Sequence, residues 1–178
     1  MNSVEFILGF AVGFFIVIIV ALGVFLIVRK KCGPSKYDER QQLIRGNAYK
    51  ASFWVLTAYL LLNGLLQVAT GIEWADLMTS SFIGVCIAIT VFVVLCIRND
   101  AYFPVNVRPK FYVVLFLVFA GVDLALGLFN LSVSDSPLLT DGKLNYHIMS
   151  FVVAAMFLAV LAAILVRSVK AKKNGEQR

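Results

Sequence analysis

Long apolar runs alternate with short polar segments along the chain. The five runs occupy residues 6–28, 51–70, 77–97, 111–131 and 148–166. Each holds about 20 residues, and a helix rises ~1.5 Å per residue, so each run can cross the ~30 Å hydrocarbon core of a bilayer. The pattern therefore predicts an all-α, polytopic membrane protein with five transmembrane helices.

The same runs argue against a β-barrel and against a large soluble core. Their apolar positions do not alternate with polar ones, as a transmembrane β-strand requires, and they leave no polar helix face. Of all residues, 61% are hydrophobic and 15% are charged, whereas soluble domains average about 25% charged residues. We therefore expect a single membrane domain over residues 1–178, placed in the cell membrane as a multi-pass protein.

Basic residues gather in three of the polar segments. Of the 16 Lys and Arg residues, all except Lys143 lie within residues 29–50, 98–110 and 167–178. Short loops rich in Lys and Arg stay in the cytoplasm. The N-terminus is therefore expected outside and the C-terminus inside, with a basic cytoplasmic tail at 167–178. The net charge of +6 follows from this topology, and it favours contact with anionic lipid head groups rather than with nucleic acid.

The first basic segment is expected to be the most structured of the connections. Gly33 and Pro34 break the first helix, and Ser35 precedes Asp38 by three residues, which is close to the spacing of a capping box. A helix that begins there and runs into the second apolar run would form a cytoplasmic juxtamembrane extension over residues 32–50. Later in the chain, Pro109 fits the first turn of the fourth helix, where its missing N–H costs little.

Asp123 is the one acidic residue inside an apolar run. A charged Asp near the middle of a membrane costs at least ~2.5–3.5 kcal/mol, so Asp123 is expected to face other helices. It stands 13 residues after Lys110, and Asn63 stands 13 residues after Lys50. Both helices are expected to run from inside to outside, so Asp123 and Asn63 are expected at a similar depth.

Polar side chains follow one face of the second apolar run. Tyr59, Asn63 and Gln67 recur every four residues and therefore share a helix face. Asp123 is the expected partner of Asn63 or Gln67, and His147, the one histidine, is expected near the outer interface. Two interpretations remain open. The polar groups either form interhelical hydrogen bonds, or they form an outward-facing ligand-binding site in which Asp123 could also accept a proton.

Small residues recur every four positions in several runs. Gly9 and Gly13 do so in the first run, and Ser80, Gly84 and Ala88 do so in the third. Such faces let helices approach closely in lipid. Contact within the bundle explains them most simply. Because the first run carries no polar residue, Gly9 and Gly13 could instead contact a partner protein or a second copy of the chain.

The search for catalytic and metal-binding motifs is negative. The chain contains no GxSxG, HExxH or GxxxxGK[ST] pattern. Its three cysteines, Cys32, Cys86 and Cys96, form no CxxC and no cluster with histidine, so they do not indicate a metal site or a disulfide framework. We expect no cofactor, no metal and no enzymatic activity.

One segment resembles a group of known proteins. The stretch at 37–50, YDERQQLIRGNAYK, resembles small, largely uncharacterised integral membrane proteins of Gram-positive bacteria that carry a DER(Q/D)xxIRGxAYK-like segment before a membrane helix. Some of these accompany small helix-turn-helix regulators. The resemblance implies a regulatory or accessory role, in which a cytoplasmic partner would contact Asp38, Glu39, Arg40 and Arg45. The same residues could also form an ordinary solvated helix start.

These observations lead to two expectations about function. The first is a non-catalytic bacterial membrane protein with an accessory, immunity or regulatory role, which acts through contacts with a partner protein. The alternative is a small transporter or ligand-binding membrane subunit that uses the polar site around Asp123, Asn63 and Gln67.

Overall fold

The structure is a computed structural model of the 178-residue chain. It describes residues 37–103, 109–133, 138–140 and 142–175, and four single positions in the first apolar run, namely Ile19, Leu22, Gly23 and Leu26. Most of the predicted first helix, with Gly9 and Gly13, lies outside the described residues. The chain divides into two units, and the long helices and the hairpin all belong to the second, Tyr37–Phe103 and Arg108–Arg178.

Four long helices dominate the described residues. Each is long and apolar enough to cross a membrane, which is compatible with a multi-pass membrane protein. The prediction of a mainly helical chain is thus confirmed in its coarse form, for four of the five predicted spans. The helices are α2 (Glu39–Thr70), α3 (Leu77–Arg98), α4 (Pro109–Val133) and α5 (Met149–Gly175).

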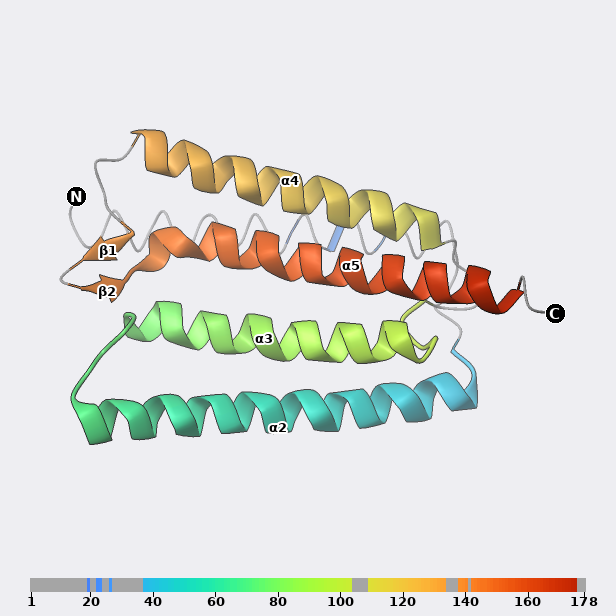
Figure 1. The fold of residues 1–178 in the computed structure, drawn as a ribbon, viewed down its shortest axis with the longest axis horizontal. Helices are drawn as coiled ribbons and strands as arrows, with labels where there is room; N and C mark the ends of the chain where they lie inside the picture. The colour runs from blue at the N-terminus through green and yellow to red at the C-terminus, as the bar shows by residue number, and fades with distance from the viewer. Residues whose placement is uncertain are drawn as a thin grey trace. The chain divides into compact units, whose positions relative to one another are not determined.

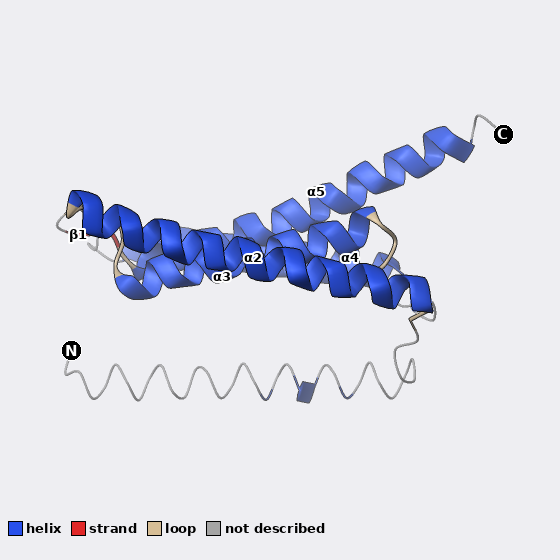
Figure 2. Ribbon diagram, turned by 90° about the horizontal axis from the view of Figure 1, so that it is seen from below, coloured by secondary structure: helices blue, strands red, loops and turns tan. Residues whose placement is uncertain are grey.

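The helix boundaries exceed the apolar runs where the polar flanks also favour a helix. α2 continues without a break from the segment after Asp38 into the second apolar run. α4 begins at Pro109, as predicted. α5 extends beyond the fifth run into the basic tail as far as Gly175, and its last turns pass the ends of the neighbouring helices (Figures 1 and 2).

The helices lie side by side in the order α2, α3, α5, α4 (Figure 1). α2 packs on α3, α3 packs on α5, and α5 packs on α4. A cluster of buried apolar side chains joins α3, α4 and α5 near the C-terminal part of α3, with Val93, Ile97, Phe103, Phe116, Val160, Leu161 and Ile164 as its members. α2 and α4 are therefore the two edges of this layer.

A short β-hairpin, which the sequence did not predict, closes one end of the layer. Strand β1 (Leu139–Thr140) pairs antiparallel with β2 (Lys143–Leu144), and Gly142 makes the turn with a φ of +76°. A single turn of 3₁₀-helix, η1 (Tyr146–Ile148), then leads into α5. This hairpin and the 71–76 link between α2 and α3 define what we call the hairpin end.

The hairpin is hydrogen-bonded to the α2–α3 link. The Leu144 N–H donates to the Trp74 carbonyl at 2.9 Å, and the Asp76 N–H donates to the Leu144 carbonyl, also at 2.9 Å. The backbone thereby connects two links that lie far apart in the sequence. The hairpin end is held by these bonds as well as by helix packing.

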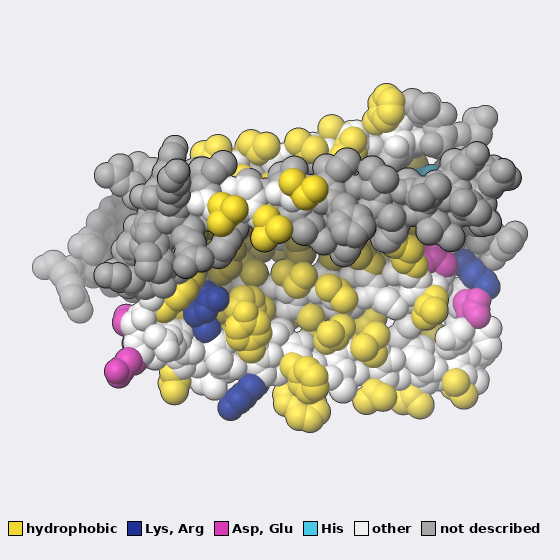
Figure 3. Space-filling model, turned by 180° about the vertical axis from the view of Figure 1, so that it is seen from behind, with side chains coloured by type: hydrophobic (Ala, Val, Ile, Leu, Met, Phe, Trp, Pro, Cys, Tyr) yellow, Lys and Arg dark blue, Asp and Glu magenta, His cyan; other side chains and the backbone are white. Residues whose placement is uncertain are grey.

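The helix surfaces are strongly apolar. On the face in Figure 3, hydrophobic side chains cover the middle of the described helices and acidic side chains lie at the two ends. Trp54, Leu62 and Val68 of α2 are 67%, 65% and 86% exposed. Exposed area of this kind is stable where lipid covers it, which agrees with helices of membrane-spanning length.

Two glycines allow close packing between neighbouring helices. A Cβ at Gly84 of α3 would lie 2.5 Å from the Tyr59 ring of α2, and a Cβ at Gly127 of α4 would lie 2.9 Å from the Phe151 ring of α5. Ser80 and Ala88, which share the small-residue face of Gly84, are also buried. The predicted close approach along α3 is therefore present, and its neighbour is α2.

Candidate functional site: a polar pocket at the hairpin end

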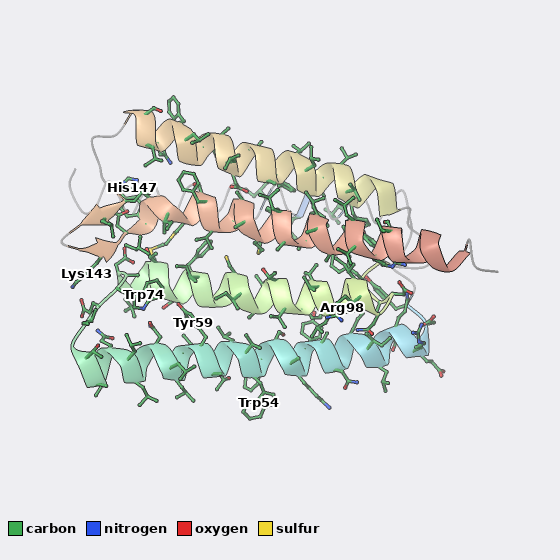
Figure 4. The ribbon with its side chains drawn as sticks, in the orientation of Figure 1. Trp54, Tyr59, Trp74, Arg98, Lys143 and His147 are labelled. Atoms are coloured by element: carbon green, nitrogen blue, oxygen red, sulfur yellow. The ribbon has the colours of Figure 1, made fainter. Side chains whose placement is uncertain are left out.

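The polar face of α2 finds its partners on α3 and on the α2–α3 link. The Tyr59 hydroxyl donates to the Ser80 carbonyl at 2.8 Å. The Trp74 indole N–H donates to Asn63 Oδ1 at 2.6 Å. Figure 4 shows Tyr59 directed from α2 toward α3, with Trp74 nearby, whereas Trp54 points away from α3. The face predicted to need partners thus has them.

Asp123 is not one of those partners. It is half-buried on α4, and α4 packs on α5, whereas α2 packs on α3. Within the described part of the chain, Asp123 makes no hydrogen bond. Equal depth along two helices does not make them neighbours, and for this reason the expected pairing of Asp123 with Asn63 or Gln67 is not formed.

His147 lies at the hairpin end, but it is not among the partners of the α2 polar face. It belongs to η1, and its ring packs on Tyr146 with 4.2 Å between the centroids. Its backbone N–H donates to Asn145 Oδ1 at 3.0 Å. The structure thus brings Tyr59, Asn63 and Gln67 together, and it leaves Asp123 and His147 apart from them.

A polar pocket lies where α2 ends, between the α2–α3 link and β2. Its volume is about 240 Å³. Polar side chains from three elements meet there: α2, the start of α3 with its preceding link, and the hairpin. The lining residues are Asn63, Gln67, Ile72, Glu73, Trp74, Ala75, Asp76, Leu77, Ser80 and Lys143.

An ion pair lies in the wall of this pocket. The Lys143 ammonium donates to one carboxylate oxygen of Glu73, and Gln67 Nε2 donates to the other at 2.8 Å. The hydrogen bond from Lys143, with its charge and the bond from Gln67, holds the pKa of Glu73 below its ordinary value of 4.5. The two charged side chains are 43% and 44% exposed, so solvent molecules and solutes can reach them.

Several polar atoms in the pocket keep hydrogen-bonding capacity. Within the described residues, the amide nitrogen of Asn63 and the amide oxygen of Gln67 have no partner. Asp76 uses one carboxylate oxygen to cap α3 through the Thr79 N–H at 2.6 Å. The pocket therefore offers amide donor and acceptor groups beside one ammonium, from Lys143, and two carboxylates, from Glu73 and Asp76.

The sequence did not lead to Glu73, Trp74 or Lys143 as site residues. Glu73 and Trp74 fall in a six-residue link, 71–76, which is too short to carry a recognisable motif. Lys143 did carry a signal, because it is the one basic residue outside the three basic segments. That exception becomes meaningful only when the hairpin brings it beside Glu73.

The opposite end of α2 carries polar residues that are used inside the fold. Asp38 caps the helix by accepting from the Gln41 N–H at 2.6 Å, and the Gln41 side chain completes the capping box. Gln41 Nε2 also donates to the carbonyls of Asp100 at 2.8 Å and Phe103 at 3.3 Å. The observed cap is therefore Asp38, and Ser35 lies outside the described residues.

The four residues expected to contact a partner divide into two groups. Asp38 caps the helix, and the Arg45 guanidinium lies 4.3 Å from the Tyr37 ring centroid and 5.7 Å from that of Phe92. Both are engaged within the chain. Glu39 and Arg40 are exposed. We call this end of α2, with the α3–α4 loop that Gln41 holds, the Gln41 end.

The α3–α4 loop, to which Gln41 donates hydrogen bonds, contains buried residues. Ala101 and Phe103 are buried, and Tyr102 lies among the rings of Phe103, Tyr112 and Phe116. Burial, with a smaller contribution from nearby tyrosines, raises the pKa of Tyr102 to about 12. The positive φ of Asp100, 60°, turns the chain there, and its carboxylate pairs with Arg167 of α5.

No protein-family model, no curated protein and no solved structure matches this chain.

Proposed function

We propose that this chain is a non-catalytic, multi-pass cell-membrane protein that binds a small polar ligand in the pocket at the hairpin end and serves an accessory or regulatory role. In this proposal the chain crosses the membrane five times, with the N-terminus outside and the C-terminus inside. The hairpin end then faces outward and the Gln41 end faces the cytoplasm.

One observation carries the proposal. The Asn63 and Gln67 side chains, in the apolar run of α2, meet Glu73 and Lys143 around a pocket of about 240 Å³. Gln67 is exposed and Asn63 is half-buried, so their spare hydrogen-bonding groups are accessible to a solute. Here amide groups with spare capacity and an exposed ion pair surround a space that a solute can enter.

A second candidate function is contact with a cytoplasmic partner protein. It is favoured by the exposure of Glu39 and Arg40 on a helix whose start is fixed by the capping box. The contact surface is smaller than the four residues predicted from the sequence, because Asp38 caps α2 and Arg45 packs on the Tyr37 ring. A contact through Gly9 and Gly13 also belongs to this proposal.

Cysteine labelling tests the orientation. In a Cys32→Ser background, Leu139→Cys places a thiol on the exposed hairpin and Glu39→Cys places one at the start of α2. A membrane-impermeant maleimide should label the first variant in intact cells and the second only after the cells are permeabilised. The reverse pattern would overturn the topology, and labelling of both in intact cells would place both ends outside.

Ligand-dependent melting tests the pocket. The purified protein in detergent is heated with ethanolamine, inorganic phosphate or phosphoethanolamine, which represent a cation, an anion and a zwitterion. We expect at least one probe to raise the melting temperature of the wild type but not of Gln67→Leu. Gln42→Leu, which changes an exposed glutamine at the other end of α2, serves as the matched control. Equal responses in all three proteins, or none, would contradict the proposal.

A further inference from the structure

We infer that the pocket at the hairpin end recognises a zwitterion, a group that carries a primary ammonium and an oxyanion a few bonds apart. This inference rests on the proposed function, since it names the ligand class of the same pocket. Its basis is the charge pattern of Glu73, Asp76 and Lys143 together with the amide groups of Asn63 and Gln67.

The Glu73–Lys143 pair favours neither a simple anion nor a simple cation, and Asp76 adds a second carboxylate that favours an ammonium group nearby. An anion bound to Lys143 would lie beside Glu73, and the two negative charges would repel each other. A cation bound to Glu73 would meet the ammonium of Lys143 in the same way. A zwitterion avoids both conflicts, because its ammonium can lie against Glu73 while its oxyanion lies against Lys143.

Binding of a zwitterion would replace the bond between Glu73 and Lys143 without leaving either side chain unpaired. In the free protein Glu73 and Lys143 satisfy each other. A zwitterion placed between them would give each a new charged partner, and hydrogen bonds to charged groups are the stronger class. The amide oxygen of Gln67 can then accept from the ligand ammonium, and the amide nitrogen of Asn63 can donate to the oxyanion.

Size and position point to a head-group-sized ligand. A volume of about 240 Å³ equals the space that about eight waters take up in the liquid, at ~30 Å³ each. A solute as small as phosphoethanolamine can therefore enter the pocket. The pocket lies where four helices of membrane-spanning length end or begin, which is the level of lipid head groups. The zwitterion could therefore be a lipid head group or a free solute.

The experiment separates these two sources. In the first arm, the detergent-solubilised protein is titrated with free phosphoethanolamine, ethanolamine and inorganic phosphate, and melting is recorded. In the second arm, the protein is placed in nanodiscs containing equal amounts of phosphatidylethanolamine and phosphatidylglycerol, and native mass spectrometry identifies the lipid that is retained. Lys143→Met and Glu73→Gln are compared with Lys50→Met, which changes an exposed lysine of α2 outside the pocket.

We expect a larger melting shift with phosphoethanolamine than with either half-molecule, or at least tenfold preferential retention of phosphatidylethanolamine. The first result identifies a free solute and the second identifies a lipid. Whichever effect the wild type shows should disappear in Lys143→Met and Glu73→Gln and persist in Lys50→Met. The thermal melts of the free proteins show that each variant is folded.

Other outcomes overturn the inference in distinguishable ways. If phosphate or ethanolamine alone acts as strongly as the zwitterion, the ligand class is wrong, but a ligand-binding pocket remains. If phosphatidylglycerol is retained instead of phosphatidylethanolamine, the pocket binds a lipid, but the inference of a zwitterion is wrong. If no probe and no lipid distinguishes the pocket variants from Lys50→Met, both the inference and the proposed function fail.

Discussion

Two glutamines on α2 show how differently the two ends of this helix are built. Gln41 is 8% exposed, and its side-chain nitrogen donates to two backbone carbonyls of the α3–α4 loop. Gln67 is exposed, and its side chain donates to a carboxylate that is itself exposed. The first amide is enclosed by the fold, whereas the second lies in a pocket that solutes can reach.

The two ends show that residue type alone does not tell whether a polar side chain on a helix is enclosed by the fold or open to solutes. A backbone carbonyl cannot leave its place without unfolding the loop, so Gln41 has fixed partners. A lysine–glutamate pair on flexible side chains can exchange its partners at low cost, because exposed ion pairs contribute little to stability. We therefore propose that the Gln41 end contributes stability and that the hairpin end binds a ligand.

Removal of the Gln41 side chain should have the largest effect. Gln41→Ala deletes part of the capping box and leaves two loop carbonyls without their donor, so we expect a loss of about 2–3 kcal/mol. Thermal denaturation in detergent measures it. Gln42→Ala, the exposed neighbour, is the control. A melting temperature of Gln41→Ala close to that of the control would contradict the assignment.

An added methyl group on α3 should have an intermediate effect. Gly84→Ala would place its Cβ 2.5 Å from the Tyr59 ring, which forces the ring away and weakens its bond to Ser80; overpacking of this kind costs about 1–3 kcal/mol. Gly64→Ala is the matched control, because nothing lies within 4 Å of a Cβ there. If both variants melt alike, α2 and α3 do not pack as described.

The ion pair at the hairpin end should have the smallest effect on stability, with a defined pH dependence. Because the pKa of Glu73 is lowered in the folded protein, its contribution is present above its ordinary pKa of 4.5 and is lost as the pH falls through the lowered value. The melting difference between wild type and Lys143→Met should therefore shrink below about pH 4.5. A difference that grows in acid would contradict the pairing.

The sequence predicted where the helices lie along the chain, because long apolar runs have few alternatives. The third run, at 77–97, coincides with α3, Leu77–Arg98, and the role of Pro109 was also predicted. The lateral order of the helices could not be predicted in the same way. Apart from the polar face of α2, the apolar runs do not show which side faces which neighbour. Depth alone therefore suggested a pairing of Asp123 with Asn63 that the order α2, α3, α5, α4 prevents.

Only the part of the candidate site that lies on α2 could be predicted from the sequence. Tyr59, Asn63 and Gln67 share a helix face by spacing alone, and the structure confirms that this face has partners. The partners Ser80, Trp74 and Glu73 follow in the next link and helix. Lys143 lies beside Glu73 because the β-hairpin places it there. The strands of this hairpin have two residues each, so they are too short to leave a periodic pattern in the sequence.

The central claim is that stability and binding reside at opposite ends of α2. The most direct test measures the melting temperature of wild type, Gln41→Ala and Gln67→Leu, each with and without phosphoethanolamine. We expect Gln41→Ala to melt lower but to keep the ligand-induced rise, and Gln67→Leu to melt close to the wild type and to lose that rise. The claim would be contradicted if Gln67→Leu kept the rise, or if Gln41→Ala lost it while remaining folded.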